Sequence, residues 1–372
     1  MSLPALAFGL LLGASSLYYL AAILAALLSP APEKNGFAPP VSVLKPVRGL
    51  DPHFYECIRS HAAQDYPEFE LLFAVRDPAD PAVPEIRKLA AEFPARRIEV
   101  FFTDQEFGPN SKINSLERLR RECRCDALLV ADSDIRVGPD YLRRVIEPLA
   151  DPQVGLVTCP YRGVPGGGVA SLLEALWISA DFQPGVLVAR LLGMRFALGA
   201  TMALTRRRLD EIGGFAPLAP YLADDYLLGK ALRERGLEIA LSDYTVETML
   251  PPQSWAASWQ HRLRWARTLR ACRPSGYAGL VVTFAVPLAL AALAVDRSLW
   301  PMAAVAVALR FAAVLSVGVA RLRDPVVARY FWLLPLADLL ALAAWLASFS
   351  GRKVVWRGEP FRIERDGRLT RV

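Results

Sequence analysis

Residues 127–134 read Ala-Leu-Leu-Val-Ala-Asp-Ser-Asp, an apolar run that ends in two carboxylates one residue apart. The run predicts a buried β-strand, and the chain must turn where that strand ends. Asp132 and Asp134 can therefore converge just beyond the sheet, and ligands of open α/β sheets bind at the carboxyl ends of the strands. Such a pair suits a hard divalent cation that shares its coordination with substrate phosphates. An Asp-rich turn without a ligand is the alternative.

Short apolar runs and amphipathic segments alternate around this stretch, from Val41 to Met249. Alternation of this kind predicts an α/β domain with a largely parallel sheet. The expected strands are 41–46, 69–77, 98–104, 127–132 and 154–161, with a strand pair near 238–249. The expected helices are 52–64, 84–93, 112–123 and 169–182, with an interfacial helix leading into a buried strand over 185–204 and a helix over 224–235. Asp77, Asp104 and Asp132 end strands, so acidic residues should gather at one edge of the sheet.

Apolar segments at both ends of the chain predict membrane helices. Leu3–Leu28 is uncharged and long enough to cross a bilayer, and it lacks the basic start of a cleaved signal peptide, so we expect an uncleaved anchor. Segments near 277–295, 299–319 and 331–349 also have the length to span, although Arg310 should then face protein or mark an interfacial segment. Three spans would separate the basic tail from the α/β domain, against the positive-inside tendency. Two arrangements therefore remain open: all three C-terminal segments span the membrane, or two span it and one is re-entrant or in-plane.

These observations define the expected domain organisation. It comprises an N-terminal anchor 1–30, a linker 31–40, an α/β domain 41–250, an interfacial helix 251–275, membrane segments 276–350 and a basic tail 351–372.

Composition favours a membrane partner over nucleic acid. The 372 residues are 53% hydrophobic and carry a net charge of +6. The soluble part has no basic run with interleaved aromatic residues, so we expect no nucleic acid partner. The basic residues instead lie beside apolar segments, where they suit anionic lipid headgroups. Five scattered cysteines indicate a reducing compartment, and Cys123-Arg-Cys125 is too tightly spaced for a usual zinc site.

Two further motifs follow the first acidic pair. Asp224-Asp225 opens a helix, where one acid would serve as an N-cap but two exceed that need. Farther on, His261, Arg264 and Trp265 share one face of an expected helix over 255–270. An interfacial amphipathic helix is the alternative interpretation of this segment, because it also carries tryptophan and arginine beside an apolar region.

In this order, Asp77, Asp132-Ser-Asp134, Asp224-Asp225 and Arg264-Trp265 resemble the motifs of lipid-directed GT-A glycosyltransferases, and of the ceramide glucosyltransferase family in particular. Further matching segments are Val41–Gly49, Gln64–Pro67, Val75–Pro81, Asn110–Asn114, Ala131–Arg136, Val154–Val157, Ala223–Tyr226 and Leu263–Trp265. The resemblance covers about 41–273. It implies a Rossmann-like GT-A domain with a mostly parallel sheet, beside one N-terminal and two to three C-terminal transmembrane helices.

The resemblance also implies roles for individual residues. Asp77 would lie at the uracil and ribose end of the donor pocket, and Asp132 and Asp134 would reach the diphosphate through Mg²⁺ or Mn²⁺. Asp225 would be the general base on the acceptor hydroxyl. The remaining donor-side residues would be Lys45, Lys112, Arg264 and Trp265. Lys112 as an ordinary solvated helix residue is the alternative.

The acceptor side is implied to include Asp224, His261 and Trp265. Arg264-Trp265 matches the end of a Q/R-x-x-R-W motif, but His261 stands where that motif has Gln or Arg. This departure leaves open both the role of His261 and the identity of the acceptor.

The residue types suit sugar transfer from a nucleotide diphosphate, which needs cations on the leaving diphosphate and a base on the acceptor. A single base implies inversion, because retention would require a second, nucleophilic carboxylate. We expect transfer of a hexose, glucose first, from a UDP-sugar to a membrane lipid such as ceramide. Transfer of N-acetylglucosamine to a hopanoid polyol is one alternative, and a lipid-binding protein on an inactive fold is another, although its acids are intact. The composition suggests a bacterial inner-membrane protein with a cytoplasmic catalytic domain, of open oligomeric state.

Overall fold

The computed structural model describes residues 2–28 and 35–372, so residues 1 and 29–34 of the expected anchor and linker lie outside the described residues. The chain divides into two compact units. The α/β unit comprises Ala31–Tyr161 and Arg195–Pro251, and the helical unit comprises Met1–Pro30, Arg162–Met194 and Pro252–Val372. The segment Arg162–Met194 therefore groups with the helical unit, whereas the sequence placed it inside an α/β domain over 41–250.

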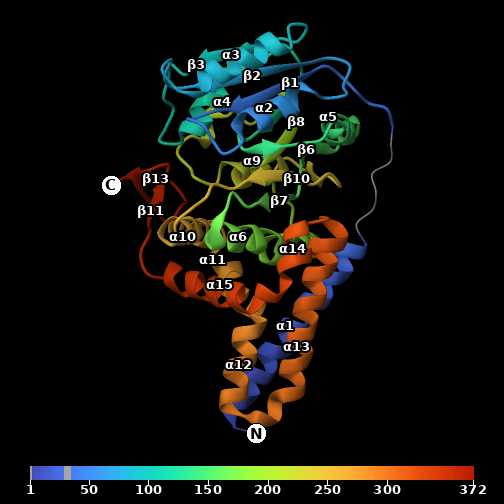
Figure 1. The fold of residues 1–372 in the computed structure, drawn as a ribbon, viewed down its shortest axis with the longest axis vertical. Coiled ribbons are helices and arrows are strands. Elements are labelled where there is room, and N and C mark those ends of the chain that lie inside the picture. Colours follow the sequence, from blue (N-terminus) through green and yellow to red (C-terminus); the bar gives the residue numbers. More distant parts are fainter. Residues whose placement is uncertain (1, 29–34) are drawn as a thin grey trace. The chain divides into compact units, whose positions relative to one another are not determined.

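A seven-stranded sheet with the order β3-β2-β1-β4-β8-β6-β9 forms the centre of the α/β unit (Figure 1). Its strands are β1 (Val41–Pro46), β2 (Phe69–Val75), β3 (Ile98–Phe102), β4 (Ala127–Ala131), β6 (Val154–Thr158), β8 (Thr201–Thr205) and β9 (Glu238–Leu241). β8 runs antiparallel to β4 and β6, and the other pairs are parallel. The predicted α/β class, with a mostly parallel sheet, is confirmed.

Helices pack against this sheet and complete its core. They are α2 (Phe54–Ala62), α3 (Ala82–Glu92), α4 (Ser111–Glu122), α5 (Tyr141–Ile146), α8 (Arg206–Glu211) and α9 (Asp224–Arg233), with short 3₁₀ turns at Glu147–Ala150 and Ala216–Leu218. Val130 of β4 and Leu72 of β2 belong to one buried cluster with Leu116 of α4 and Leu228 of α9. Every residue of β4 is buried, which explains why its sequence is continuously apolar rather than alternating.

The segment 238–249 differs from the expected strand pair. Two strands form, but β9 pairs with β6, whereas β10 (Val246–Met249) pairs antiparallel with β5 (Ile135–Arg136). Ser242 redirects the chain between them, because its N–H donates to Thr158 O and its hydroxyl accepts from Tyr244 N–H. β10 thereby pairs with the strand that directly follows the turn at Ser133 and Asp134. The short strand β7 (Tyr161–Val164) lies where the chain passes from one unit to the other.

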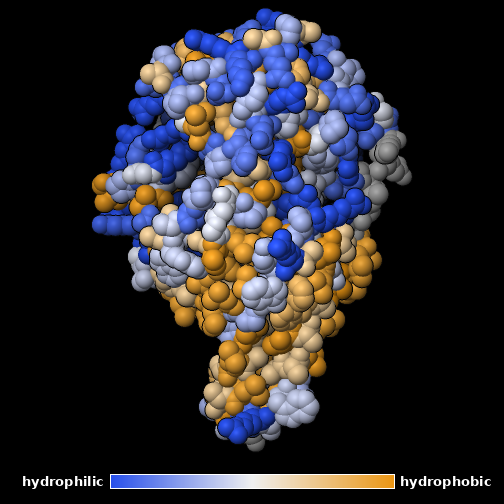
Figure 2. Space-filling model, viewed as in Figure 1, coloured by the Kyte–Doolittle hydropathy of each residue, from blue (hydrophilic) through white to orange (hydrophobic). Residues whose placement is uncertain are grey.

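Three apolar helices form a bundle in the helical unit: α1 (Leu3–Leu27), α12 (Ala285–Val295) and α13 (Trp300–Val314). Gly9, near the start of α1, faces Leu299 and Met302, whereas the Tyr19 hydroxyl donates to Thr283 O at 2.5 Å. α1 therefore runs antiparallel to α12 and parallel to α13. Apolar side chains cover the part of the surface where Figure 1 places these helices (Figure 2).

Other helical-unit elements lie between and after these. They are α6 (Gly168–Trp177), the π-helical turn η2 (Ile178–Phe182), α7 (Gln183–Leu191), α10 (Trp255–Cys272), α11 (Pro274–Ala278), η4 (Gly279–Thr283), η5 (Arg297–Leu299), the π-helical turn η6 (Leu315–Arg321), α14 (Pro325–Tyr330), η7 (Phe331–Leu333) and α15 (Leu334–Ser348). Four continuous helical stretches are long and apolar enough to cross a membrane: Leu3–Leu27, Gly168–Leu191, Arg297–Arg321 and Pro325–Ser348. A fifth candidate is the pair Pro274–Thr283 and Ala285–Val295, bent by 68°. The expectation of membrane helices at both ends is confirmed, and Gly168–Leu191 adds an apolar stretch that was not expected to span.

α15 runs across the direction of α12 and α13 in Figure 1, as an in-plane helix would. This is one of the two arrangements that the sequence left open. If α15 does not cross the membrane, the chain after α13 stays at the end of the bundle where α1 ends. The basic tail, 351–372, contains a three-stranded antiparallel sheet of β11 (Lys353–Trp356), β12 (Glu359–Ile363) and β13 (Leu369–Arg371).

Arg310 of α13 faces the protein interior, which is one of the two placements expected for a charge in an apolar segment. Its side chain is 0% exposed, and its guanidinium is 2.6 Å from Asp338 of α15 and 2.7 Å from Asp181 of η2. It also donates to Ala180 O at 2.5 Å. Two carboxylates and a carbonyl thus satisfy a cation that would be costly if left unpaired in an apolar environment.

Candidate functional site

The turn after β4 holds the acidic pair Asp132 and Asp134 at the edge of the main sheet. Met249 N–H of β10 donates to Asp134 O at 3.0 Å, so the β5–β10 pair fixes the far side of the turn. The Ser133 hydroxyl donates to the Asp51 carboxylate at 2.5 Å. The two carboxylates are therefore oriented by the buried strand β4, by the pairing of β5 with β10 and by the hydrogen bond from Ser133 to Asp51.

Lys45 of β1 contacts the backbone of this turn from the protein interior. Its side chain is fully buried, and its Nζ donates to the backbone carbonyl of Asp132 at 3.0 Å. The His61 ring nitrogens lie 3.4 and 3.5 Å from the same Nζ. Burial lowers the pKa of Lys45 to about 8, while the neighbouring acids act in the opposite direction. In this structure Lys45, expected on the donor side, contacts the backbone of the acidic turn.

Lys112 of α4 bridges the two acidic motifs. Its ammonium lies 2.6 Å from Asp132 and 4.0 Å from Asp224, and its side chain is 11% exposed. Burial acts to lower the pKa of Lys112, but the carboxylates of Asp132 and Asp224 outweigh this effect and raise it. Lys112 is therefore a buried cation within the acidic cluster and not the solvated helix residue of the alternative interpretation.

Asp134 lies close to other carboxylates. Burial, followed by repulsion from Asp132 and Asp51, raises the pKa of Asp134 to about 7. A divalent cation would relieve this repulsion, and carboxylate oxygens are the ligands that Mg²⁺ and Mn²⁺ favour. In the described part of the chain, no three His, Cys, Asp or Glu side chains are grouped to hold an ion by themselves. Asp132 and Asp134 would instead supply one or two carboxylates to a metal that also binds substrate phosphates.

Asp224 and Asp225 begin α9 on the other side of Lys112. The N-cap position is Ala223, so neither acid is the N-cap residue. Asp224 is 7% exposed and accepts from Asn110 Nδ2 at 3.3 Å, and Asp225 accepts from Tyr226 N–H at 2.7 Å. Burial and then the adjacent Asp224 raise the pKa of Asp225 to about 6. A carboxylate with such a pKa can act as a general base near neutral pH.

Sequence reasoning did not assign three residues that shape this cluster. Asn110 is the N-cap of α4, where its Oδ1 accepts from Ile113 N–H, and its amide donates to Tyr221 O at 2.8 Å. It thereby links the helix that carries Lys112 to the loop before α9. Gly199 leaves room beside Asp225, because an added Cβ would lie 3.1 Å from its carboxylate. Asp51 holds Ser133. Only Asn110 carried a sequence signal, as an N-cap before a helix.

Asp77 is separate from these contacts. It follows β2 and is exposed, and its carboxylate accepts from Ala79 N–H at 2.8 Å. Such a turn gives the side chain a defined direction at the edge of the sheet. Its expected role at the uracil and ribose end of a donor pocket therefore stays a prediction.

His261 and Trp265 of α10 lie in the helical unit, within a polar and aromatic cluster. His261 Nδ1 is 2.6 Å from Glu174 of α6, and Trp265 Nε1 donates to His261 Nε2 at 3.1 Å. This geometry fits a neutral imidazole that carries its proton on Nδ1. The Trp265 ring also packs edge-on against Trp177 and Phe182, at centroid distances of 5.4 and 5.3 Å. His261 thus fills the motif position by joining a carboxylate to the tryptophan.

Arg264 is also on α10. Burial lowers its pKa to about 10, Glu174 counteracts this effect, and the nearby Arg357 reinforces it. An arginine that is desolvated and lies near another cation is suited to receive an anion. The predicted residues therefore fall into two groups: Lys45, Lys112, Asp132, Asp134, Asp224 and Asp225 lie together in the α/β unit, and His261, Arg264 and Trp265 lie in the helical unit.

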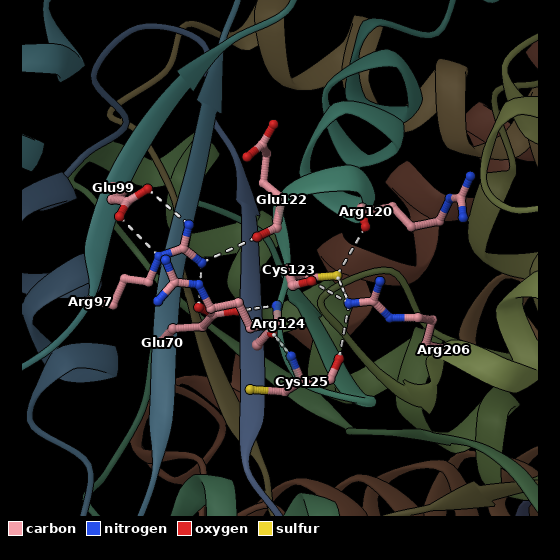
Figure 3. Close-up of polar contacts among 10 residues, drawn as sticks. Glu70, Arg97, Glu99, Arg120, Glu122, Cys123, Arg124, Cys125 and Arg206 are labelled. Carbon is pink, nitrogen blue, oxygen red and sulfur yellow. Dashed lines mark hydrogen bonds and ion pairs between the residues drawn. The ribbon is translucent and has the colours of Figure 1, made fainter.

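Cys123 and Cys125 precede β4, at the opposite end of this strand from Asp132 (Figure 3). Arg206 Nη2 donates to Cys123 Sγ at 2.9 Å and to Cys125 O at 3.3 Å, and the Cys123 thiol donates to Arg120 O at 3.1 Å. Burial raises the pKa of Cys123 to about 11 and also raises that of Cys125. A protonated, hydrogen-bonded thiol is a structural group and a poor metal ligand.

The sequence was compared with known protein families. A model described as glycosyl transferase family 21 matches residues 8–369, which is nearly the whole chain. The chain belongs to this family. Its relatives include ceramide glucosyltransferase 1 of Caenorhabditis elegans, 30% identical over 57% of this chain and 46% of the relative. Ceramide glucosyltransferase 3 of the same organism is 26% identical over 65% of this chain and 53% of the relative. This family 21 chain thus spans about half the length of the curated relatives it matches.

The solved structures support the fold. A mannosyltransferase from Pyrobaculum calidifontis, in complex with GDP-Man and Mn2+, superposes with a TM-score of 0.56 at 22% identity. The match covers 93% of this chain and 98% of that chain. At this identity the likeness concerns the GT-A fold, which it shares with this family 21 protein.

Proposed function

We propose that this protein transfers glucose, or a related hexose, from a UDP-sugar to a hydroxyl group of a membrane lipid such as ceramide, with inversion. The observation that carries the proposal is the charged cluster of Lys112, Asp132 and Asp225 at the edge of the main sheet, in a chain of family 21. Its relatives named ceramide glucosyltransferases support the lipid and the sugar. The apolar helices support an acceptor that is supplied from the bilayer.

In the proposed mechanism, Asp132 and Asp134 would hold a divalent metal, and the solved mannosyltransferase with GDP-Man and Mn2+ offers a precedent. When bound, the metal neutralises charge on the diphosphate. Lys112 adds a fixed positive charge at the same edge of the sheet and keeps Asp132 oriented, with 2.6 Å between their charged groups. A preorganised positive charge stabilises the leaving diphosphate, because little reorganisation is needed during the reaction.

Asp225 would accept the proton of the acceptor hydroxyl while that oxygen attacks the anomeric carbon and the diphosphate leaves. Its raised pKa keeps it ionised at neutral pH yet basic enough to take a proton. One base on the face opposite the leaving group gives inversion, because direct displacement needs no second nucleophile. The catalytic unit would lie on the cytoplasmic side, where nucleotide sugars are available.

The test is mass spectrometry of lipid extracts from a host that expresses the full chain, with Asp225→Asn as the matched inactive control. Purified protein is then assayed with UDP-glucose or UDP-N-acetylglucosamine, and with ceramide or a hopanoid polyol. We expect a glucosylated ceramide whose anomeric configuration is opposite to that of the donor. Transfer of N-acetylglucosamine to the hopanoid would replace both proposed substrates. No product with any pair, despite bound lipid, would favour the lipid-binding protein on an inactive fold.

A further inference from the structure

Basic side chains line a cavity of about 580 Å³ that is largely open to solvent, in the helical unit. It is lined by Arg267, Gly351, Arg352, Lys353, Arg362 and Glu364, which we call the basic cavity. Four cations thus face one carboxylate. That carboxylate, Glu364, already accepts from the Thr370 hydroxyl at 2.6 Å. The basic cavity therefore carries excess positive charge.

The cations of the basic cavity lack counterions. Across residues 2–28 and 35–372, none of the four is in an ion pair with a carboxylate. Lys353 of β11 and Arg362 of β12 are direct cross-strand partners, and like charges in that position repel. The Nε of Arg267 is buried without a hydrogen-bond partner among the described residues. An unsatisfied buried donor and a repelling pair both cost stability, and an anion would relieve both.

The framework of the basic cavity is held by backbone contacts. Arg267 Nη2 donates to Ser350 O at 2.6 Å, and Arg267 Nη1 donates to Lys353 O. Arg270 Nη2 donates to Gly351 O at 2.9 Å. Two arginines of α10 thus fix the segment between α15 and β11. Lys353 and Arg362 are presented by the small sheet and Arg267 by α10, and a flexible tail would give no such arrangement.

The basic cavity begins three residues after the end of an apolar helix, since α15 ends at Ser348. Aromatic rings gather at this end: Trp345 and Phe349 have centroids 4.9 Å apart, and Tyr277 lies 5.7 Å from Phe349. Tryptophan and tyrosine are enriched where a membrane meets water. With this end of α15 at the membrane surface, the cations would lie at the level of lipid headgroups, where anionic lipids attract basic segments.

We propose that the basic cavity binds a phosphate-class anion, and that its source is the headgroup of an anionic phospholipid. The planar guanidinium groups of Arg352 and Arg362 suit the oxygens of a phosphate, each offering more than one N–H. None of the residues that line the basic cavity was assigned to sugar transfer, so we expect the site to anchor the protein and not to take part in the reaction.

The test is native mass spectrometry of the full chain in detergent, with phosphatidylglycerol or phosphatidylcholine added at equal concentrations. The cavity variant carries Arg352→Gln with Arg362→Gln. The matched control carries Arg365→Gln with Arg371→Gln, which removes the same charge from exposed positions of the same segment outside the basic cavity. Each basic residue near an anionic lipid contributes about fivefold in affinity. The cavity variant should therefore bind phosphatidylglycerol about 25-fold more weakly, and the control variant less than about twofold more weakly.

Three results would overturn the proposal. An equal loss in both variants would mean general surface attraction, and no preference for phosphatidylglycerol in the unmodified protein would mean no anion site. Displacement of the lipid by inorganic phosphate or glycerol phosphate at comparable concentration would assign the site to a soluble anion. Thermal unfolding of each variant checks that folding is intact. This measurement detects lipid binding alone, so it does not depend on whether the protein transfers sugar.

Discussion

The strongest prediction concerns the pH dependence of sugar transfer through Asp225. A general base must be deprotonated, so activity should rise with pH through the pKa of Asp225, which burial and Asp224 raise to about 6. With that pKa, about 9% of the protein is active at pH 5 and about 91% at pH 7, from the titration relation. We therefore expect kcat/KM to fall about tenfold from pH 7 to pH 5.

A substitution beside the base gives this prediction its control. Asp224→Asn keeps the size of the side chain but removes the neighbouring charge that raises the pKa of Asp225. The acid limb should then move to lower pH by about one unit, an effect of the size expected for one nearby charge. Asp225→Asn should abolish the limb and reduce turnover by about 10²-fold or more, with UDP binding retained.

The assay is initial-rate kinetics in detergent across pH 5–8, with saturating Mn²⁺. Saturation matters because Asp134, whose pKa is raised to about 7 by burial and by neighbouring acids, would otherwise titrate in the same range. A flat profile down to pH 5 would refute the assignment of the base. So would an acid limb that stays at the same pH in Asp224→Asn.

The remaining predictions concern other buried charges. Lys112→Met should lower kcat/KM about tenfold or more. It should also move the acid limb to higher pH, because Lys112 lowers the pKa of Asp225 and pairs with Asp132. An unchanged acid limb in the same assay would contradict this prediction. Arg310→Met should destabilise the helical unit by about 3–5 kcal/mol by leaving the buried Asp338 unpaired, measured by thermal unfolding in detergent, and a smaller loss in Arg310→Lys would be the control. His261→Gln should retain more turnover than His261→Ala, since an amide can still bridge a carboxylate and an indole N–H; equal losses would exclude that bridging role.

Local patterns account for the parts of the fold that sequence could predict. β1 and β4 were located almost to the residue, because a buried strand in a parallel sheet must be apolar throughout and because charge can begin only where the strand ends. The same reasoning placed Asp132 at the edge of the sheet. The helices α3 and α4 followed from amphipathic periodicity, with boundaries within two residues of those observed.

Long-range contacts account for what sequence could not predict. Glu174 and His261 are 87 positions apart, so no local pattern indicates that they pair. The sequence also gave no sign that the buried Lys45 donates to the Asp132 carbonyl, 87 positions away, and its donor-side role stays a prediction. The last 22 residues looked like a basic tail, because alternation over such short strands is too weak to distinguish a small sheet from a solvated segment.

The sequence by itself determined that a buried strand ends in Asp132-Ser133-Asp134 and that membrane helices lie at both ends. It also determined that the acidic residues follow one another in the order of the glycosyltransferase motifs. These properties depend on neighbours in the chain, through strand alternation, apolar length and spacing. Only the tertiary structure decided that Lys112 joins Asp132 to Asp224, and that α15 runs across the bundle. Those arrangements depend on which distant surfaces pack together, since burial and charge act through space and not along the sequence.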